Sequence, residues 1–559
     1  MVRKIFGFFY RETSTLHKAA YLLGLFAILS QILALLRDRL LAHIFGAGSS
    51  LDVYYAAFRI PDFLFVTVAS VVSLSVIVPF IVEKEKDGHE AVHRFVDNVF
   101  SFFSIMIVVV CALTFCFIPE IADLLFKGFT LVEKKEVIVL SRILLISPIA
   151  LGFSNLFGAL TQAYNRFFIY ASAPLVYNLG IILGIVFLAP TYGVKGVAVG
   201  VAVGAVLHML IQVPFVIRLG LFPRLSTKLD FRSIRRVAGL SLPRTLTLSI
   251  NHISTIFMVS IASLMAAGSI SVFSFSLNIQ SVPLSVIGVS YSLAAFPTLS
   301  RHFADKNIKA FISQMAVTAR HIIFWSLPVT ALFIVLRAQI VRVLLGSGQF
   351  SWDDTRLTAA ALAIFALSTV FQSLMLLFVR AFYSAGHTKK PLIVNLVSTA
   401  ILILCSYLLV HAFYRFEDFR YFIDALLKVQ DVPGTVVLML PLGYTIGTII
   451  NGIIHWIGFE RDFKGFSKEV NRTLFQSASA SVIIGFVSNL YLNVFANAFD
   501  TNTFMGIFLQ GFLAGLVGIS AGISVLMLLK NREILEVWDS IHSKFWKTKG
   551  AILTDQEII

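Results

Sequence analysis

Apolar segments of about 20 or more residues recur along the whole chain and constrain its fold more than any other feature. A helix of that length crosses the roughly 30 Å hydrocarbon layer of a bilayer. Charged residues make up only 13% of the sequence, about half the fraction found in ordinary globular domains. The sequence therefore predicts an all-α polytopic membrane protein with about 14 transmembrane helices. The expected spans are 19–45, 53–82, 96–118, 138–161, 170–190, 193–217, 237–265, 270–299, 315–345, 357–384, 391–412, 436–459, 473–497 and 503–529.

The net charge of +15 raises the question of a nucleic-acid partner, but its distribution argues against one. If the N-terminus is cytoplasmic, most Lys and Arg residues fall in cytoplasmic loops and tails, which is the positive-inside bias of membrane proteins. The basic linker 218–236 is interpreted as an orientation signal beside anionic lipid. We therefore expect both termini to be cytoplasmic and no nucleic acid to bind.

Two short sequences recur in the same order about 220 residues apart. Pro174–Leu179 (PLVYNL) recurs as Pro391–Leu396 (PLIVNL), and Ala47–Ser49 (AGS) recurs as Ala267–Ser269. The offset spans six predicted helices, so the two halves would cross the membrane in the same direction. Parallel six-helix repeats are a known plan of transporters, with the substrate site between the halves.

This duplication predicts an N-lobe at 19–217 and a C-lobe at 237–461, joined by the basic linker, with two extra helices at 473–529. The remaining ends are expected to be surface segments. The basic, aromatic N-terminus (1–18) is expected to lie along the inner membrane surface. The tail 530–559 has apolar residues at helical spacing among charged ones, which is typical of a cytoplasmic amphipathic helix.

Ionisable residues inside membrane spans are rare and usually mark a hydrated path or a binding cavity. Arg37 shares a helical face with Ser30, and this favours a cavity role over anchoring at the membrane surface. Its neighbours Asp38 and Arg39 are expected to point in other directions, with Arg39 reaching the membrane surface.

A second polar stripe is expected in the next span, where Asp52, Tyr55 and Arg59 are three and then four residues apart. Pro61 follows and should weaken the helix locally, so the stripe favours a gated cavity. Arg380 lies near the cytoplasmic end of the tenth span, where anchoring is as good an interpretation as substrate contact.

Two motif searches bear on enzymatic activity. His89–His93 (HEAVH) matches the zinc-protease pattern, but it lies in a charged stretch without an obvious third ligand, so a solvated loop is the better interpretation. No phosphate-binding loop is present. We expect a transporter and not an enzyme, with no metal or cofactor, driven by the membrane potential or by an unidentified coupling ion.

The stretch 30–61 (SQILALLRDRLLAHIFGAGSSLDVYYAAFRIP) resembles the first two helices of the MurJ/MviN family, a branch of the MOP exporter superfamily. The resemblance continues through 165–179, 282–301, 346–362 and 380–391. It implies fourteen helices in two six-helix lobes plus two more. It also implies an activity, the flipping of lipid II, the undecaprenyl-diphosphate precursor of peptidoglycan, across the bacterial inner membrane.

By position, the resemblance implies that Ser30, Arg37, Asp38, Asp52 and Arg59 belong to the substrate cavity. The chain also departs from the family. Gln31, Phe65, Val66 and Asn278 stand where the family usually has arginines, and Ala69-Ser70-Val71 replaces an Ala-Glu-Gly sequence. The outer segment 412–434 is longer than the family's and could form a surface helix or a lid.

The resulting hypothesis is a lipid-linked oligosaccharide flippase that works by alternating access in the bacterial cytoplasmic membrane, with lipid II as its substrate. Tyr55, Asn278 and Arg380 complete the candidate cavity. Two alternatives stay open. One is a related exporter of another polyprenyl-linked saccharide or amphiphile, favoured by the missing arginines. The other is a membrane scaffold that recruits cell-wall synthesis enzymes.

Overall fold

The computed structural model describes residues 16–69, 74–226 and 229–546. These residues fold into helices joined by short connections, and no strand occurs among them, so the all-α prediction is confirmed. Nearly all of the predicted interfacial N-terminus, the end of the tail (547–559), and Ser70 and Val71 lie outside the described residues.

Eleven helices in the described part of the chain are long and apolar enough to cross a membrane. A bent pair, Trp352–Ala366 and Thr369–Ser384, makes twelve if it forms one span with a 43° bend. The two helices before residue 69 are not among them, and both carry charged residues in their interiors. The chain is thus a multi-pass membrane protein, and the total of fourteen spans stays a prediction.

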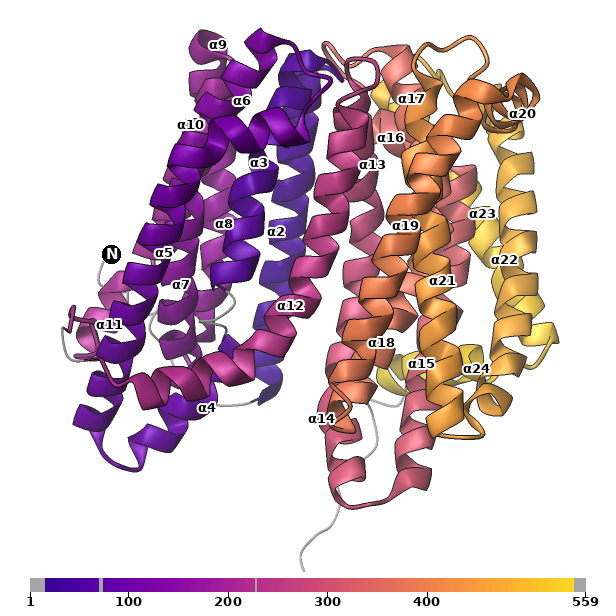
Figure 1. Ribbon diagram of the computed structural model, residues 1–559. Helices are drawn as coiled ribbons and strands as arrows, with labels where there is room; N and C mark the ends of the chain where they lie inside the picture. Colours follow the sequence, from indigo (N-terminus) through magenta and orange to yellow (C-terminus); the bar gives the residue numbers. More distant parts are fainter. Residues whose placement is uncertain (1–15, 70–73, 227–228, 547–559) are drawn as a thin grey trace, which may run out of the picture. The chain divides into compact units, whose positions relative to one another are not determined.

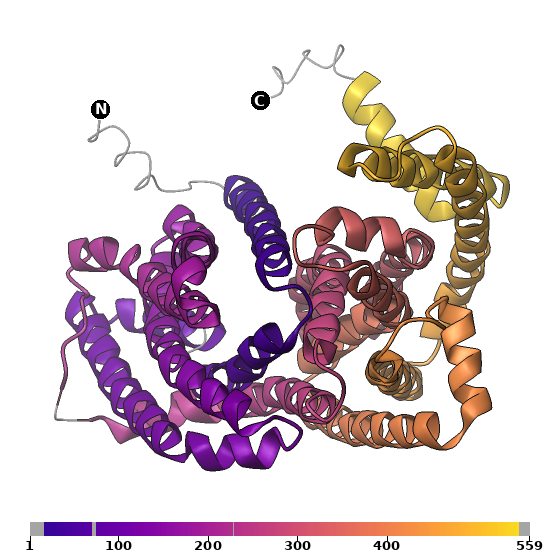
Figure 2. The same cartoon turned by 90° about the horizontal axis from the view of Figure 1, so that it is seen from above.

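The chain separates into two compact units, and each is described by itself (Figure 1). Unit 1 comprises Met1–Ile279, Leu344–Ala361 and Thr388–Gly447, and unit 2 comprises Gln280–Val343, Leu362–His387 and Thr448–Ile559. Within each unit most helices run side by side (Figure 1; Figure 2, seen from above). These two units are defined by contacts within the chain and do not test the lobe boundaries predicted from the repeats, which stay a prediction.

The helices that lie wholly or partly in unit 1 are α2 (Leu16–Phe45), α3 (Ser49–Val68), α4 (Leu74–Glu85), α5 (His89–Leu125), α6 (Leu131–Leu144), α7 (Ile146–Ala163), α8 (Phe167–Leu183), α9 (Ala189–Tyr192), α10 (Val194–Leu210), α11 (Val213–Arg218), α12 (Phe231–Ala262), α13 (Ser269–Pro283), α17 (Trp352–Ala366), α19 (Lys389–Arg415), α20 (Glu417–Leu427) and α21 (Met439–Asp462). Those wholly in unit 2 are α14 (Ser290–Ala304), α15 (Ile308–Val335), α18 (Thr369–Ser384), α22 (Phe466–Ala496), α23 (Phe504–Leu528) and α24 (Arg532–Trp546). Unit 2 also holds most of α16 (Arg337–Leu344).

Close helix packing in unit 1 places α8 beside both α2 and α10. A side chain on Gly180 of α8, or on Gly184 directly after it, would overlap the backbone of Gly204 or Gly200 of α10, respectively. Small residues allow this approach, which is the usual way helices associate in lipid. The packing fixes the position of the polar side chains that α8 presents to α2.

Each unit has its own apolar core. In unit 1, buried side chains of α3, α4, α5 and α7 form a cluster that includes Phe80, Phe95 and Phe103. In unit 2, the cluster includes Phe311, Phe378 and Phe459. The tail begins with α24, whose buried Glu533 is paired with Arg320 at 3.0 Å, so this helix packs against α15.

Candidate functional site

The best-connected polar cluster of unit 1 is centred on Arg37 and Asp38 of α2. The Arg37 guanidinium donates two hydrogen bonds to Asp38 Oδ1, at 2.9 and 2.8 Å. Asp38 Oδ2 accepts a third bond from Asn278 Nδ2 at 3.0 Å. Asp38 is buried, whereas the Arg37 side chain is 22% exposed. The carboxylate is therefore enclosed, while the Arg37 side chain stays partly exposed.

Asn178 of α8 joins this cluster to Ser30. Its amide nitrogen donates to Ser30 Oγ at 3.3 Å, and its amide oxygen lies 3.5 Å from Arg37 Nη1. Sequence reasoning did not select Asn178 as a site residue. The available signal was its place in the repeated hexapeptide, where a buried amide needs a partner.

The expectation that Asp38 points away from Arg37 is wrong. Residues adjacent on a helix start in directions about 100° apart, so their side chains ordinarily diverge. The arginine side chain is long enough to fold back, and its guanidinium reaches the shorter aspartate. Arg37 and Asp38 therefore form an ion pair.

The stripe on α3 lies along α13. Asp52 accepts hydrogen bonds from the backbone nitrogens of Gly268 and Ser271, both at 2.7 Å, and from Ser271 Oγ at 2.6 Å. The Tyr55 ring packs edge-on against Phe275. Arg59 Nη2 donates to Ser274 Oγ at 3.1 Å. The predicted alignment of the three residues is present, and the helix continues through Pro61 to Val68.

Asp52 belongs to a tightly closed contact that we call the α2–α3 junction, made by residues 46–52, 268–271 and 348–354. A Cβ on Gly268 would overlap the carbonyl oxygen of Ala47, so the two copies of the Ala-Gly-Ser sequence touch here. The backbone nitrogen of Gln349 donates to the His43 carbonyl at 2.9 Å. Asp52 is 3% exposed, and its carboxylate accepts the hydrogen bonds that hold the 268–271 turn to α3.

The polar side chains near the middle of α3 are less fully hydrogen-bonded than Asp52. The Arg59 Nε and the Tyr55 hydroxyl are buried and have no hydrogen-bond partner. Asp62, three residues after Arg59, lies within electrostatic range of both Arg59 and Arg37. Sequence reasoning missed Asp62, although its spacing from Arg59 places the two on neighbouring positions of one helix. Such a set of donors can hold an anion.

Comparison with known proteins shows the family to which the chain belongs. The model of the family described as "MurJ: Lipid II flippase MurJ" matches residues 41–416. The chain belongs to the MurJ family. It is 29% identical over 386 residues to a probable lipid II flippase MurJ of Thermotoga maritima, which covers 68% of this chain and 76% of the relative.

Solved structures agree on the fold. A lipid II flippase MurJ in an inward closed conformation superposes with a TM-score of 0.71 at 22% identity, covering 93% of this chain and 100% of the other. An inward-facing multidrug-resistance MATE transporter of the MOP superfamily gives 0.63 at 17% identity, covering 78% and 96%. Identities this low indicate a shared fold.

Two residues of this MurJ-family chain stand at positions where an arginine was expected. Asn278 uses its amide to bond Asp38, so the carboxylate has a neutral second partner instead of a cation. Phe65 packs against the apolar cluster of unit 1. These two positions therefore contribute no positive charge to the α2–α3 region.

Arg380 belongs to unit 2. Its Nη1 atom donates to Ser292 Oγ at 2.9 Å and lies 3.3 Å from the Val289 carbonyl oxygen, so it joins α18 to the start of α14. The structure describes this residue within its own unit only, and its predicted cavity role stays a prediction.

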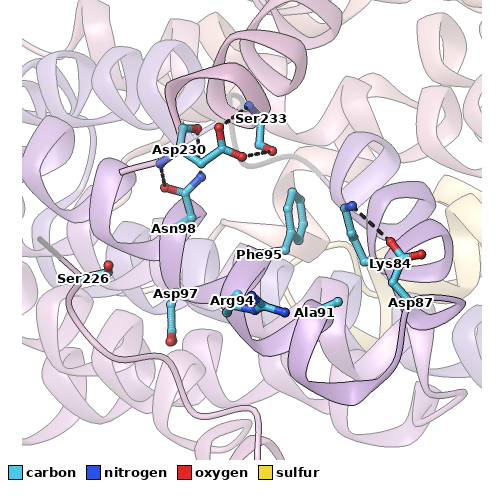
Figure 3. A pocket seen from close by; sticks show the side chains of 10 residues that line it. All are labelled: Lys84, Asp87, Ala91, Arg94, Phe95, Asp97, Asn98, Ser226, Asp230 and Ser233. Atoms are coloured by element: carbon cyan, nitrogen blue, oxygen red, sulfur yellow. Dashed lines mark hydrogen bonds and ion pairs between the residues drawn. The ribbon is translucent and has the colours of Figure 1, made fainter. Parts of the chain in front are cut away.

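A cavity of about 640 Å³ lies between the α4–α5 turn, α5 and the start of α12 (Figure 3). Its polar groups mostly bond one another: Asn98 exchanges two bonds with the Asp230 backbone, and Lys84 pairs with Asp87. Hydrogen bonds from Ser233 hold the pKa of Asp230 below its ordinary value. The hydrogen bonds around this cavity therefore hold the linker against α5.

The His-Glu-x-x-His sequence lies in the first turns of α5, so the prediction of a loop there is wrong. Its second histidine, His93, bonds Asp97 at 2.9 Å, and Asp97 also accepts the backbone nitrogen of Arg224 at 2.7 Å. Among the described residues, no group of three or more His, Cys, Asp or Glu side chains could hold a metal ion.

Proposed function

We propose that the protein moves lipid II across the bacterial cytoplasmic membrane, with Arg37 and Arg59 as the groups that receive the diphosphate. The observation that carries this proposal is the partly exposed Arg37 side chain together with the unpartnered Nε of Arg59, on successive helices of one unit. Arginine binds phosphate through charge-assisted hydrogen bonds, which are about twice as strong as neutral ones. Membership of the MurJ family supports this choice of substrate.

The energetics need no nucleotide. Moving two negative charges outward across an inside-negative potential of 100 mV gains roughly 4–5 kcal/mol, at about 2.3 kcal/mol per charge. The polyprenyl tail would stay in lipid while the head group crosses a hydrated cavity. With both termini in the cytoplasm, the α2–α3 junction lies at the outer surface, where its closure would block passage until the lobes rearrange.

Carboxylates beside the two arginines oppose the binding of an anionic substrate. Two arginines, Arg37 and Arg59, share their surroundings with the carboxylates of Asp38 and Asp62. An incoming diphosphate must compete with both carboxylates for the same donors. Uptake of a cation together with the substrate would relieve this competition, and we propose this as the role of the coupling ion.

The test is translocation of lipid II by purified protein in liposomes. Arg37→Ala and Arg59→Ala should each lower the rate by about 10-fold or more, because each removes a charge-assisted bond of roughly 1.5–3 kcal/mol. Arg39→Ala is the matched control on α2 and should translocate at nearly the wild-type rate. Full translocation by both site variants would contradict the assignment.

A second candidate function is export of another polyprenyl-linked saccharide. It is favoured by the neutral side chains Gln31, Val66 and Asn278, since fewer cations suit a less anionic cargo. Direct binding to lipid II, to undecaprenyl phosphate and to a cationic amphiphile separates the two. Tighter binding of the diphosphate than of the monophosphate supports lipid II, and the reverse order supports the alternative.

A further inference from the structure

The connection between α19 and α21 contains a helix that lies beyond the part of the chain matched by the family model. That match ends at residue 416, and α20 begins at Glu417. The single residue Phe416, in an extended conformation, separates α20 from the last residue of α19. In Figure 1, α20 lies at the same end of unit 1 as the start of α17.

One side of α20 and the chain that follows it pack firmly on unit 1. Ile423, Val429 and Val432 are buried. Arg356 at the start of α17 donates two bonds to the Asp431 carboxylate, at 2.8 and 2.6 Å, and one to the Lys428 carbonyl at 2.7 Å. Three bonds from one side chain fix the orientation of the helix.

The apolar side of α20 is wider than the part that unit 1 covers. Phe422 and Leu426, one turn apart, are 60% and 62% exposed, whereas Ile423 is 7% exposed. At about 100° per residue, Glu417 lies on the opposite side of the helix from Leu426. The exposed surface thus has an apolar side formed by Phe422 and Leu426 and a polar side that includes Glu417, with Asp418 at the boundary between them.

We propose that α20 lies in the plane of the membrane interface, with Phe422 and Leu426 inserted among lipid acyl chains and Glu417 in water. An amphipathic helix that lies on a membrane has this division of its surface. The proposal concerns a lipid-contact surface and does not depend on which substrate the protein carries.

The connection to α19 limits where α20 can be. One extended residue spans at most about 3.6 Å, so α20 must stay close to the membrane surface at which α19 ends. α19 carries exposed apolar side chains such as Leu404 and Leu408 along its length, and its last turn exposes Tyr414. The exposed apolar side chains of α20 thus follow directly on a helix whose own exposed side chains suit contact with lipid.

The exposed side chains also have the chemistry of an interfacial segment. Tyr414, in the last turn of α19, is 67% exposed, and tyrosine is enriched at the level of lipid head groups because its ring is apolar and its hydroxyl is polar. The charges nearby are of both signs, with Glu417 and Asp418 against Arg415 and Arg420. Apolar insertion, and not net charge, would hold the helix to the bilayer.

Site-directed spin labelling of the full chain in liposomes tests this placement. The three native cysteines, Cys111, Cys116 and Cys405, are first replaced by Ala. Single cysteines are then introduced as Phe422→Cys and Leu426→Cys, with Glu417→Cys as the matched control on the same helix. Collision of each label with oxygen, which concentrates in lipid, is compared with collision with a water-soluble nickel chelate.

Labels at 422 and 426 should collide several-fold more with oxygen than with the nickel chelate, and the label at 417 should show the reverse. Nickel access at 422 and 426 equal to that at 417 would overturn the proposal, because the surface would then face water. Shielding of both labels from both reagents would also overturn it, since a second copy of the chain would then cover the surface. Arg356→Gln should increase the mobility of the label at 426, and unchanged mobility would contradict the anchoring role of Arg356.

Discussion

The α2–α3 junction and the arginines farther along the same two helices use their polar groups in opposite ways. At the junction, Asp52 bonds three donors of the 268–271 turn and is almost completely buried. Along the helices, Arg37 stays partly exposed and Arg59 keeps an unpartnered Nε. A charge whose bonds are all made inside the protein stabilises the fold, whereas a charge with open donors is available to a ligand.

This comparison separates residues that the family resemblance groups together. Asp52 and Arg59 lie on one helix, two turns apart, and both match positions of the family's cavity. From their surroundings we propose that Asp52 closes the junction and that Arg59 binds the ligand. The predictions below test this division, beginning with the largest effect.

Asp52→Ala should strongly destabilise the protein. It leaves the backbone nitrogens of Gly268 and Ser271 and the Ser271 hydroxyl buried without an acceptor, which costs about 3–5 kcal/mol. Unfolding of the purified protein in detergent measures the loss, with Asp418→Ala on the exposed start of α20 as the control. A variant that unfolds like wild type but no longer binds lipid II would place Asp52 in the binding site instead.

Gly268→Ala should have the next largest effect. Gly268 has a φ of +92°, and an added Cβ would also overlap the Ala47 carbonyl oxygen. Backbone strain and overpacking together predict a loss of about 3 kcal/mol. Gly386→Ala is the matched control, because Gly386 has a φ of +73° but open space around its Cβ position. Its loss should be about 1–2 kcal/mol, from backbone strain alone. Equal losses in the two variants would mean that the junction is not closely packed.

Asn278→Arg should strengthen the binding of an anionic ligand. It places a second cation beside Asp38, at a position where the resemblance leads us to expect an arginine. Affinity for a diphosphate lipid should rise by about 10-fold, the equivalent of roughly 1.4 kcal/mol, with Asn278→Gln as the neutral control. Binding that stays unchanged in Asn278→Arg would show that the anion does not approach Asp38.

Asp62→Asn should produce the smallest effect. Removing this carboxylate ends its competition for Arg59, so affinity for the diphosphate should rise by about threefold, as for a weak ion pair of less than 1 kcal/mol. Asp305→Asn, at an exposed carboxylate after α14, is the control for a general change in charge. Weaker binding in Asp62→Asn would indicate that this carboxylate binds the substrate or a cation that the substrate requires.

Much of the fold could be predicted from the sequence because a bilayer imposes a length and a composition on each span. The alignment of Asp52, Tyr55 and Arg59 on one side of α3 followed from helical spacing alone. Their partners did not, since Asp52 bonds a turn more than 200 residues later and spacing carries no information about such contacts. Asp38 was placed wrongly because spacing describes where a side chain starts and not how far an arginine can fold back.

The count of spans shows a similar limit. Apolar length identifies helices whose surroundings are lipid or other apolar helices. Neither of the two helices that bear the candidate site, α2 and α3, is among the eleven apolar spans. In α3 the cause is plain, because every stretch of 18 residues contains Asp52, Arg59 and Asp62. In α3, the residues that suggest function are thus the same ones that make the span hard to recognise by apolar length alone.

Binding of lipid II to the double variant Arg37→Ala/Arg59→Ala tests the central assignment most directly. The measurement compares lipid II with an analogue in which a neutral linker replaces the diphosphate, using protein whose unfolding temperature matches wild type. The wild-type chain should prefer the diphosphate, and the double variant should bind both lipids with similar affinity. A double variant that keeps the full preference would contradict the assignment of these two arginines to the anionic part of the substrate.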